Sequence, residues 1–295
     1  MRSLHPACHC GESLLVLALR APLQDSHNDQ NIQGLTEGPV DRRTFNNNGL
    51  TLSYLDSGGN GPALIALHAH WLEAKTFAPF AAALGPDWRV IALDQRGHGY
   101  SSHAPTYTRQ DYLADLSALF DHLHISKAVL LGNSLGGVNA YQFAALYPDR
   151  VLALIIEDIG VVIADDTSFC LAWSGSFATY EELAERVGAR FLPFLKDSIR
   201  SDAAGWRLAF DPKDMVQSQS YLNGDHWTDW LASSCPALVI RGRDSQVTNQ
   251  QHLEQMVERR PGAQLKVLPG GHVVHADNLE EFTNTVREFL ADLPR

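Results

Sequence analysis

The sequence predicts an α/β protein built on a mostly parallel, doubly wound sheet with helices on both faces. Short aliphatic runs such as Ala128–Leu131 alternate with segments of helical character. Strands that are buried on both faces of a parallel sheet have this continuous apolar character. The chain has 295 residues, of which 45% are hydrophobic and 19% charged, enough for a sizeable core. A single core that carries an insertion therefore fits better than two equal domains.

The N-terminal half predicts a hairpin followed by alternating strands and helices. Asn48-Gly49 lies between the runs 43–45 and 50–55, and this dipeptide is a strong signal for a tight hairpin turn. Further strands are expected at 63–67, 89–93, 127–131 and 152–156. Helices are expected at 76–84, 109–123 and 138–147, the last of them closed by Pro148.

The alternation stops after Asp158. Residues from about 161 to 230 are helical and rich in aromatic side chains, with no clear strand, and strands resume at 237–241 and 264–268. We therefore expect a helical cap, residues 161–230, inserted after the sixth strand. The expected core comprises residues 41–160 and 231–295, and residues 1–40 are expected to form a poorly ordered extension.

The composition excludes several classes of partner. A formal net charge of −11 argues against nucleic acid or an anionic membrane, because either would require a basic patch. A small-molecule substrate is the expected partner, and the oligomeric state stays open. The four cysteines imply no disulfide framework, and the cluster of His5, Cys8, His9 and Cys10 matches no zinc spacing. No apolar stretch approaches a spanning helix and no convincing signal peptide is present, so a cytoplasmic location is expected.

Gly132-Asn133-Ser134-Leu135-Gly136 is the most specific motif of the chain, since it lies between a predicted strand and a predicted helix. This pattern is typical of a nucleophile elbow, a sharp turn that exposes a serine hydroxyl and needs small residues around it. Unpaired backbone N–H groups at the start of the helix suit a developing negative charge. Ser134 is therefore the candidate nucleophile, and the amide of Leu135 is a candidate oxyanion donor.

A serine nucleophile needs a base and an acid that orients the base. Asp244 follows the strand at 237–241 and is the expected acid, because the order along the chain should be serine, acid, histidine. Asp158, after the preceding strand, is the second choice. His272 follows the last strand behind two glycines and is the expected base, with His275 as its rival.

From about residue 42 onward the chain resembles the α/β-hydrolase superfamily, in particular small serine hydrolases with a helical cap. Besides the elbow, the resemblance rests on 68–71, Asp94–Ser101, 242–244 and 271–272. It implies a second oxyanion donor in the backbone N–H of His70, with Trp71 as an alternative. Alanine stands at position 69, where glycine is usual in the family. The resemblance also implies that His68, Arg96 and His98 hold loops together, and the mechanism requires neither a metal nor an organic cofactor.

The cap is expected to supply the substrate pocket. Its dense aromatic residues form either its own small core or an apolar pocket, and the sequence does not decide between the two. The residues proposed for the pocket are Trp71, Trp173, Phe177, Trp206 and Trp227.

The favoured function is hydrolysis of a small, largely apolar ester or lactone through an acyl-enzyme at Ser134. A hydrolase that cleaves carbon–carbon bonds is an alternative, although the extended glycine-rich oxyanion loop of such enzymes is missing. A haloperoxidase-like enzyme would usually have methionine where Leu135 stands, and a dehalogenase would need aspartate at position 134. A ligand-binding signalling protein that keeps a slow triad is the hypothesis from another class.

Overall fold

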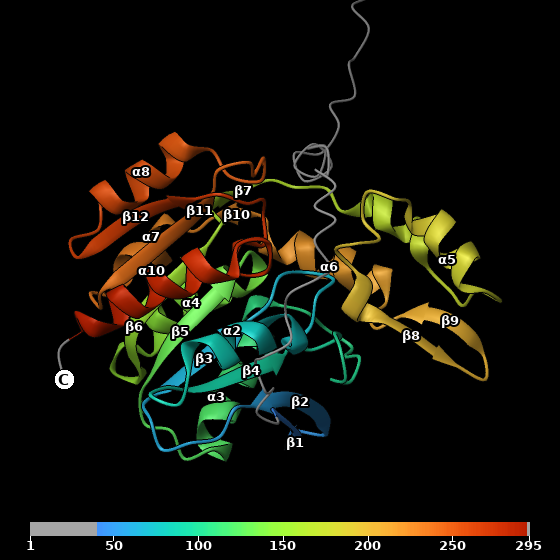
Figure 1. The fold of residues 1–295 in the computed structure, drawn as a ribbon, viewed down its shortest axis with the longest axis horizontal. Helices are drawn as coiled ribbons and strands as arrows, with labels where there is room; N and C mark the ends of the chain where they lie inside the picture. The colour runs from blue at the N-terminus through green and yellow to red at the C-terminus, as the bar shows by residue number, and fades with distance from the viewer. Residues whose placement is uncertain (1–39, 294–295) are drawn as a thin grey trace, which may run out of the picture.

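An eight-stranded sheet forms the centre of the protein. We describe residues 40–293 of a computed structural model, so the expectations for the N-terminal extension, including its His and Cys cluster, lie outside the described residues. The strand order is β1-β2-β4-β3-β5-β6-β11-β12, and all neighbours pair in parallel except β1 with β2 and β2 with β4 (Figure 1). The strands are β1 (Asp41–Asn47), β2 (Leu50–Asp56), β3 (Ala63–Leu67), β4 (Arg89–Asp94), β5 (Ala128–Asn133), β6 (Val151–Glu157), β11 (Ala237–Gly242) and β12 (Ala263–Leu268). The predicted α/β fold class is confirmed.

The predicted hairpin joins β1 and β2. Asn48 and Gly49 have φ angles of 51° and 89°, and two consecutive positive φ values are what a tight two-residue hairpin turn requires. Asn and Gly adopt such angles at the lowest cost, which explains why this dipeptide predicted the turn correctly.

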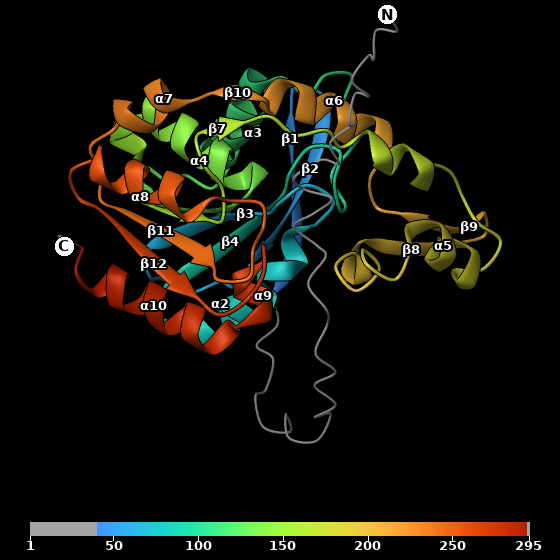
Figure 2. The ribbon, with the colours of Figure 1, turned by 90° about the horizontal axis from the view of Figure 1, so that it is seen from above.

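Helices cover both faces of the sheet (Figure 2). On β5, the side chains of Val129 and Leu131 pack into one hydrophobic cluster and that of Leu130 into the other, because successive strand residues point to opposite faces. The cluster with Leu130 includes α3 (Arg109–His122), α4 (Leu135–Leu146), α7 (Trp227–Ala232) and α8 (Gln250–Glu258). The other includes α2 (Ala78–Leu84), α9 (Val274–Asp277) and α10 (Leu279–Ala291).

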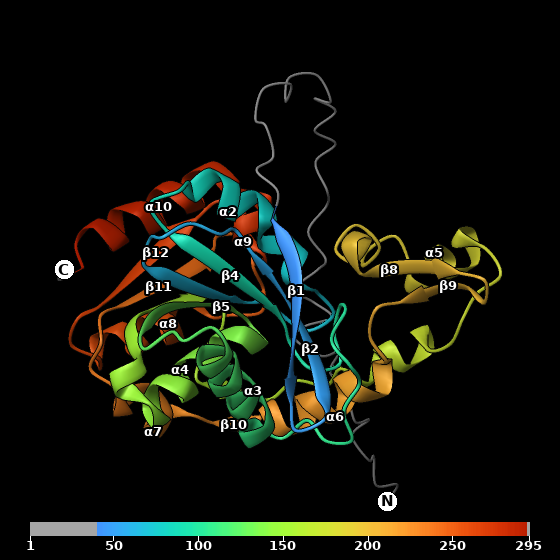
Figure 3. The same cartoon turned by 90° about the horizontal axis from the view of Figure 1, so that it is seen from below.

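The segment between β6 and β11 lies outside the eight-stranded sheet and contains more than helices (Figure 3). Its helices are η3 (Ser168–Trp173), α5 (Tyr180–Val187), η4 (Lys196–Ser198), α6 (Pro212–Leu222) and, just before β11, α7. Two antiparallel pairs also occur, β7 (Val162–Ile163) with β10 (Gly224–Asp225), and β8 (Ile199–Asp202) with β9 (Gly205–Leu208). The expectation of no strand here is wrong, because strands of two to four residues are too short to show a period.

Within residues 40–293, no helix is both long and apolar enough to cross a bilayer.

Candidate active site

Ser134 sits in a sharp turn between β5 and α4. Its φ and ψ are 52° and −117°, a conformation that a residue with a side chain rarely adopts. The two glycines of the motif are sterically required, since an added Cβ would lie 2.2 Å from the Gly136 carbonyl oxygen at Gly132 and 2.0 Å from the Leu67 carbonyl oxygen at Gly136. The strand, the turn and the helix therefore have the geometry that the motif predicts.

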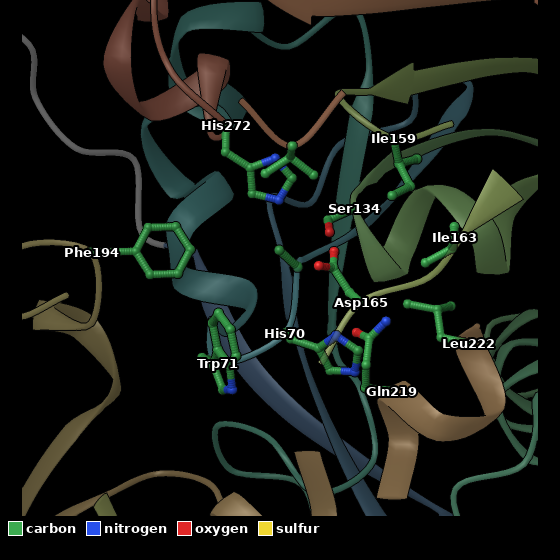
Figure 4. Close-up of a pocket in the computed structure, with 12 residues that line it drawn as sticks. His70, Trp71, Ser134, Ile159, Ile163, Asp165, Phe194, Gln219, Leu222 and His272 are labelled. Carbon is green, nitrogen blue, oxygen red and sulfur yellow. The ribbon is translucent and has the colours of Figure 1, made fainter. Parts of the chain in front are cut away.

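His272 and Ser134 line the same cavity (Figure 4). His272 follows β12, and Gly270, with a φ of 132°, allows the loop to turn back toward the sheet. The side-chain amide of Asn133, the neighbour of Ser134, donates to the His272 carbonyl at 2.9 Å. The loop of the histidine is thus tied directly to the turn of the serine.

The carboxylate that orients His272 is Asp158, not Asp244. The Nδ1–H of His272 donates to Asp158 Oδ2 at 2.8 Å, and both side chains are buried. Asp244 is exposed, and its backbone N–H donates to the Gly270 carbonyl at 3.0 Å. The prediction of Asp244 as the acid is therefore corrected in favour of the second choice, Asp158.

The loop after β11 explains this outcome. It directs two hydroxyls and an amide at Asp158: Ser245 Oγ donates to Oδ2, Thr248 Oγ1 donates to Oδ1 at 2.8 Å, and the Gly242 N–H approaches Oδ1 at 3.3 Å. Strands β6 and β11 are parallel neighbours, so acids that follow either strand lie at the same edge of the sheet. The hydroxyls of Ser245 and Thr248 were the signal in the sequence that the loop after β11 binds the carboxylate of the acid. A loop with this role does not also contribute the acid itself.

His275, the rival base, belongs to a separate buried pair. Its Nδ1–H donates to Glu157 Oε2 at 2.7 Å, its Nε2 lies 3.0 Å from Thr76 Oγ1, and its ring stacks on Phe77. It does not line the cavity of Ser134. These contacts give His275 a structural role.

The loop after β3 carries the expected second oxyanion donor. Its strained residue is Trp71, with a φ of 68°, and not Ala69, where the family usually has glycine. The His70 side chain is buried, and its Nε2 lies 2.8 Å from Ser218 Oγ on α6. Ser218 Oγ in turn lies 2.8 Å from the hydroxyl of Tyr112 on α3. This network fixes the side chain of the residue whose amide is the candidate donor.

The three other polar residues at the strand ends hold loops, as expected. His68 Nε2 accepts from the Gln95 N–H at 3.0 Å, and Arg96 makes a bidentate contact with Asp115. The His98 Nδ1–H donates to the Arg96 carbonyl at 2.9 Å.

Burial keeps these imidazoles neutral near pH 7. It lowers the pKa of His68 to about 4 and that of His98 to about 3, and the pKa of His70 lies well below its usual 6.5 for the same reason. A cation without a carboxylate partner would pay a large desolvation cost at these positions.

The cavity has a volume of about 480 Å³, part of it open to solvent. Of the predicted pocket residues only Trp71 lines it. Trp173, Phe177 and Trp206 pack with Trp71 in the aromatic core of the cap, and Trp227 lies under the guanidinium of Arg259. Aromatic density alone does not distinguish a core from a pocket, and here four of the five residues belong elsewhere. The other residues of the lining were not among the predicted pocket residues: Ala69, Ile159, Ile163, Asp165, Phe194, Gln219, Leu222 and Val247.

The sequence profile of the Alpha/beta hydrolase family matches residues 58–285. This chain belongs to the alpha/beta hydrolase family. Among its relatives, the sn-1-specific diacylglycerol lipase ABHD11 of Danio rerio is 34% identical over 275 residues, covering 86% of this chain and 86% of the relative. Esterase YbfF of Escherichia coli is 27% identical over 244 residues, covering 79% of this chain and 94% of the relative. The crystal structure of E-2-(acetamidomethylene)succinate hydrolase superposes with a TM-score of 0.76 at 25% identity, over 86% of this chain and all of that structure. Because the chain belongs to this family and its relatives are named as esterases, lipases and hydrolases, it is a hydrolase.

Proposed function

We propose that this alpha/beta hydrolase cleaves a small, largely apolar ester or lactone through a covalent acyl-enzyme at Ser134. The observation that carries the proposal is the bond between His272 Nδ1 and Asp158 beside a serine in an elbow turn. Ser134 Oγ attacks the carbonyl carbon while His272 Nε2 takes its proton. Asp158 holds the imidazole in the required tautomer and stabilises the imidazolium that forms.

The negative charge that develops on the carbonyl oxygen needs fixed donors. The N–H of Leu135, the first residue of α4, has no carbonyl one turn earlier in its own helix and is one such donor. The N–H of His70 is the second. His272 then protonates the leaving alkoxide, and a water activated by the same imidazole releases the acid and restores Ser134.

The lining of the cavity supports the substrate class. Ile159, Ile163, Leu222 and Val247 give it apolar walls, which suit the hydrocarbon part of an ester or lactone. The names of the relatives, an esterase and a lipase among them, agree with ester cleavage. Cytoplasmic location remains part of the proposal.

The test is a panel of p-nitrophenyl esters of increasing chain length together with lactones, run beside a fluorophosphonate label. Sustained turnover that Ser134→Ala abolishes, with loss of labelling, is the expected result. Full activity of Ser134→Ala on every substrate would overturn the proposal. Single-turnover labelling with a ligand-dependent change of shape would instead indicate a ligand-binding signalling protein. Labelling of Ser134 without cleavage of any ester or lactone in the panel would favour a hydrolase of carbon–carbon bonds.

A further inference from the structure

The side chain of His70 presents a polar atom to the catalytic cavity. His70 lines this cavity together with Ser134 (Figure 4), and its Nε2 is already engaged by Ser218 Oγ at 2.8 Å. In the part of the chain that the structure describes, no hydrogen bond engages the other ring nitrogen, Nδ1, and this atom is not fully enclosed by protein. The Nδ1 of His70 is therefore open to a ligand in the cavity.

The hydrogen-bond chain behind His70 makes Nδ1 a donor. Ser218 Oγ lies 2.8 Å from the Tyr112 hydroxyl, and among residues 40–293 it is the one acceptor that this hydroxyl reaches. Burial raises the pKa of Tyr112, so the phenol keeps its proton and donates it to Ser218, which in turn donates to His70 Nε2. Burial also holds the pKa of His70 well below 6.5. The neutral ring therefore carries its single proton on Nδ1.

Gln219, the neighbour of Ser218 on α6, adds an acceptor to the same cavity. The backbone of Asp165 fixes the amide of Asn223, because the Asp165 N–H donates to Asn223 Oδ1 at 3.0 Å and Asn223 Nδ2 donates to the Asp165 carbonyl at 2.8 Å. Gln219 must then donate to Asn223 Oδ1 through its Nε2, at 2.8 Å. Its Oε1 receives no hydrogen bond from the described residues and is not fully enclosed. The cavity thus holds one donor and one acceptor with fixed roles.

We propose that the acyl chain of the preferred ester or lactone carries a hydroxyl group, which accepts from His70 Nδ1–H and donates to Gln219 Oε1. This inference rests on the proposed hydrolysis at Ser134. A hydroxyl combines a donor and an acceptor in one small group, whereas an ether oxygen can only accept. The backbone N–H of the same His70 is the proposed donor to the carbonyl oxygen, so the hydroxyl should lie close to the scissile carbonyl. A substrate without it would leave two polar atoms of the cavity unmatched, which is how such sites discriminate.

The experiment uses two pairs of phenyl esters. Phenyl 3-hydroxypropanoate is paired with phenyl butanoate, in which methyl replaces the hydroxyl, and phenyl 3-methoxypropanoate with phenyl pentanoate, in which methylene replaces the ether oxygen. We expect the wild-type protein to favour the hydroxyl ester over butanoate by about tenfold or more in kcat/KM. The methoxy ester should be favoured over pentanoate by only about threefold, because its oxygen can accept but not donate. Comparing these two ratios between protein variants cancels the intrinsic reactivity of each ester.

Substitutions of His70 separate the contributions of its two ring nitrogens. Counted in bonds from Cβ, the amide nitrogen of asparagine stands where Nδ1 does, and that of glutamine stands where Nε2 does. His70→Gln should therefore reduce both ratios by about threefold, whereas His70→Asn keeps a donor near the position of Nδ1 and should retain more of each ratio. A side chain that only supports its loop would lower the rates of all four esters together and leave the ratios unchanged.

Substitution of Gln219 tests the acceptor. Gln219→Met keeps the length of the side chain and removes the amide oxygen, so the hydroxyl ratio should fall by about threefold while the methoxy ratio stays unchanged. Gln217→Met makes the same change at an exposed position of α6 outside the cavity and should leave both ratios as they are.

Binding of the four esters to Ser134→Ala, measured by calorimetry, gives a second readout that needs no turnover, and the same preferences should appear in the affinities. Equal kcat/KM within each pair, or ratios that survive both His70→Gln and Gln219→Met, would overturn the inference. If butanoate is then still cleaved in a Ser134-dependent way, the proposed function stands while the inference fails. If the wild-type protein cleaves no ester and the calorimetric preference for the hydroxyl ester is present, the proposed function fails and the recognition of the hydroxyl stands.

Discussion

His272 and Asp158 form the buried pair of the site, with Nδ1 and Oδ2 2.8 Å apart, although 114 positions separate them in sequence. The acid follows β6, and the hydroxyls that hold it come from the loop after β11. One strand is therefore followed by the proposed acid, and its neighbour is followed by the loop that binds this acid. Substitutions of the acid and of the loop test the two contributions separately.

Replacing the acid should nearly abolish catalysis. Asp158→Asn removes the charge that stabilises the imidazolium and favours the wrong tautomer, so kcat should fall by about 10³- to 10⁴-fold. Asp244→Asn is the matched control, because it makes the same change on the exposed side chain of the loop after β11, and its kcat should stay within about twofold of wild type. Steady-state kinetics on one ester measures both. A larger loss of kcat in Asp244→Asn than in Asp158→Asn would instead identify Asp244 as the acid.

Ser245 is expected to be a positioning residue. Ser245→Ala removes the donor to the same Asp158 oxygen that binds His272, and a bond to a charged group is worth about 1.5 to 3 kcal/mol, so kcat should fall by about 10- to 100-fold. KM should change little, since Ser245 does not line the cavity. Ser245→Thr keeps the hydroxyl and should restore most of the activity. If Ser245→Ala lowers the stability of the protein without lowering kcat at unchanged KM, Ser245 is not a positioning residue.

The elbow should not tolerate an added methyl group. Gly136→Ala would place a Cβ 2.0 Å from the Leu67 carbonyl oxygen, so the turn must shift and fluorophosphonate labelling of Ser134 should be lost. Gly58→Ala is the control, because an added Cβ there meets nothing within 4 Å and costs only the strain of a positive φ, about 1 kcal/mol. Thermal unfolding of both variants separates local distortion from global unfolding. A normally labelled Gly136→Ala protein would contradict the geometry.

Acid should destabilise the protein through its buried histidines. The pKa of His98 is lowered to about 3 in the folded state, so the unfolded chain binds more protons between pH 6.5 and about 3. The free energy of unfolding must then fall as the pH falls through this window. His98→Gln should reduce the slope by about 1.4 kcal/mol per pH unit relative to the wild-type protein. Urea unfolding at several pH values gives the slope of the unfolding free energy against pH. Equal slopes for the wild-type protein and His98→Gln would show that His98 does not cause the acid destabilisation.

The aromatic residues in the core of the cap should affect stability more than selectivity. Trp173 is 4% exposed and packs edge-on against Trp71 with ring centres 5.8 Å apart, so Trp173→Ala should cost about 3 to 5 kcal/mol of unfolding free energy. Phe194 lines the cavity and should instead shift the preferred ester chain length when replaced by alanine. Denaturation and the ester panel together test both expectations. A change in chain-length preference with unaltered stability in Trp173→Ala would place it in the pocket.

The sequence predicted the features that local chemistry determines. Asn48-Gly49 specified its turn by φ preference, and the glycines around Ser134 specified the elbow, because no other residue fits there. The aliphatic runs predicted the parallel sheet, since both faces of such strands are buried.

The features that depend on how distant segments meet could not be predicted. Asp158 and Asp244 both follow strands that end at one edge of the sheet, and apart from the hydroxyls at 245 and 248 no local pattern indicates which carboxylate reaches His272. Trp173 and Phe194 are both aromatic residues of the cap, and only packing separates a core side chain from a lining one.

Trp71 and its neighbour His70 link the cap to the chemistry. The carbonyl of Trp71 accepts from Ser198 Oγ at 2.6 Å, its indole packs in the aromatic core of the cap, and His70 contacts Ser218 on α6. Any lifting of the cap must break these contacts or pull on the loop that carries the proposed amide donor. As long as these contacts hold, displacement of the cap also displaces the loop of His70, so a substrate too large for the closed cap would bind to an enzyme whose proposed amide donor has moved.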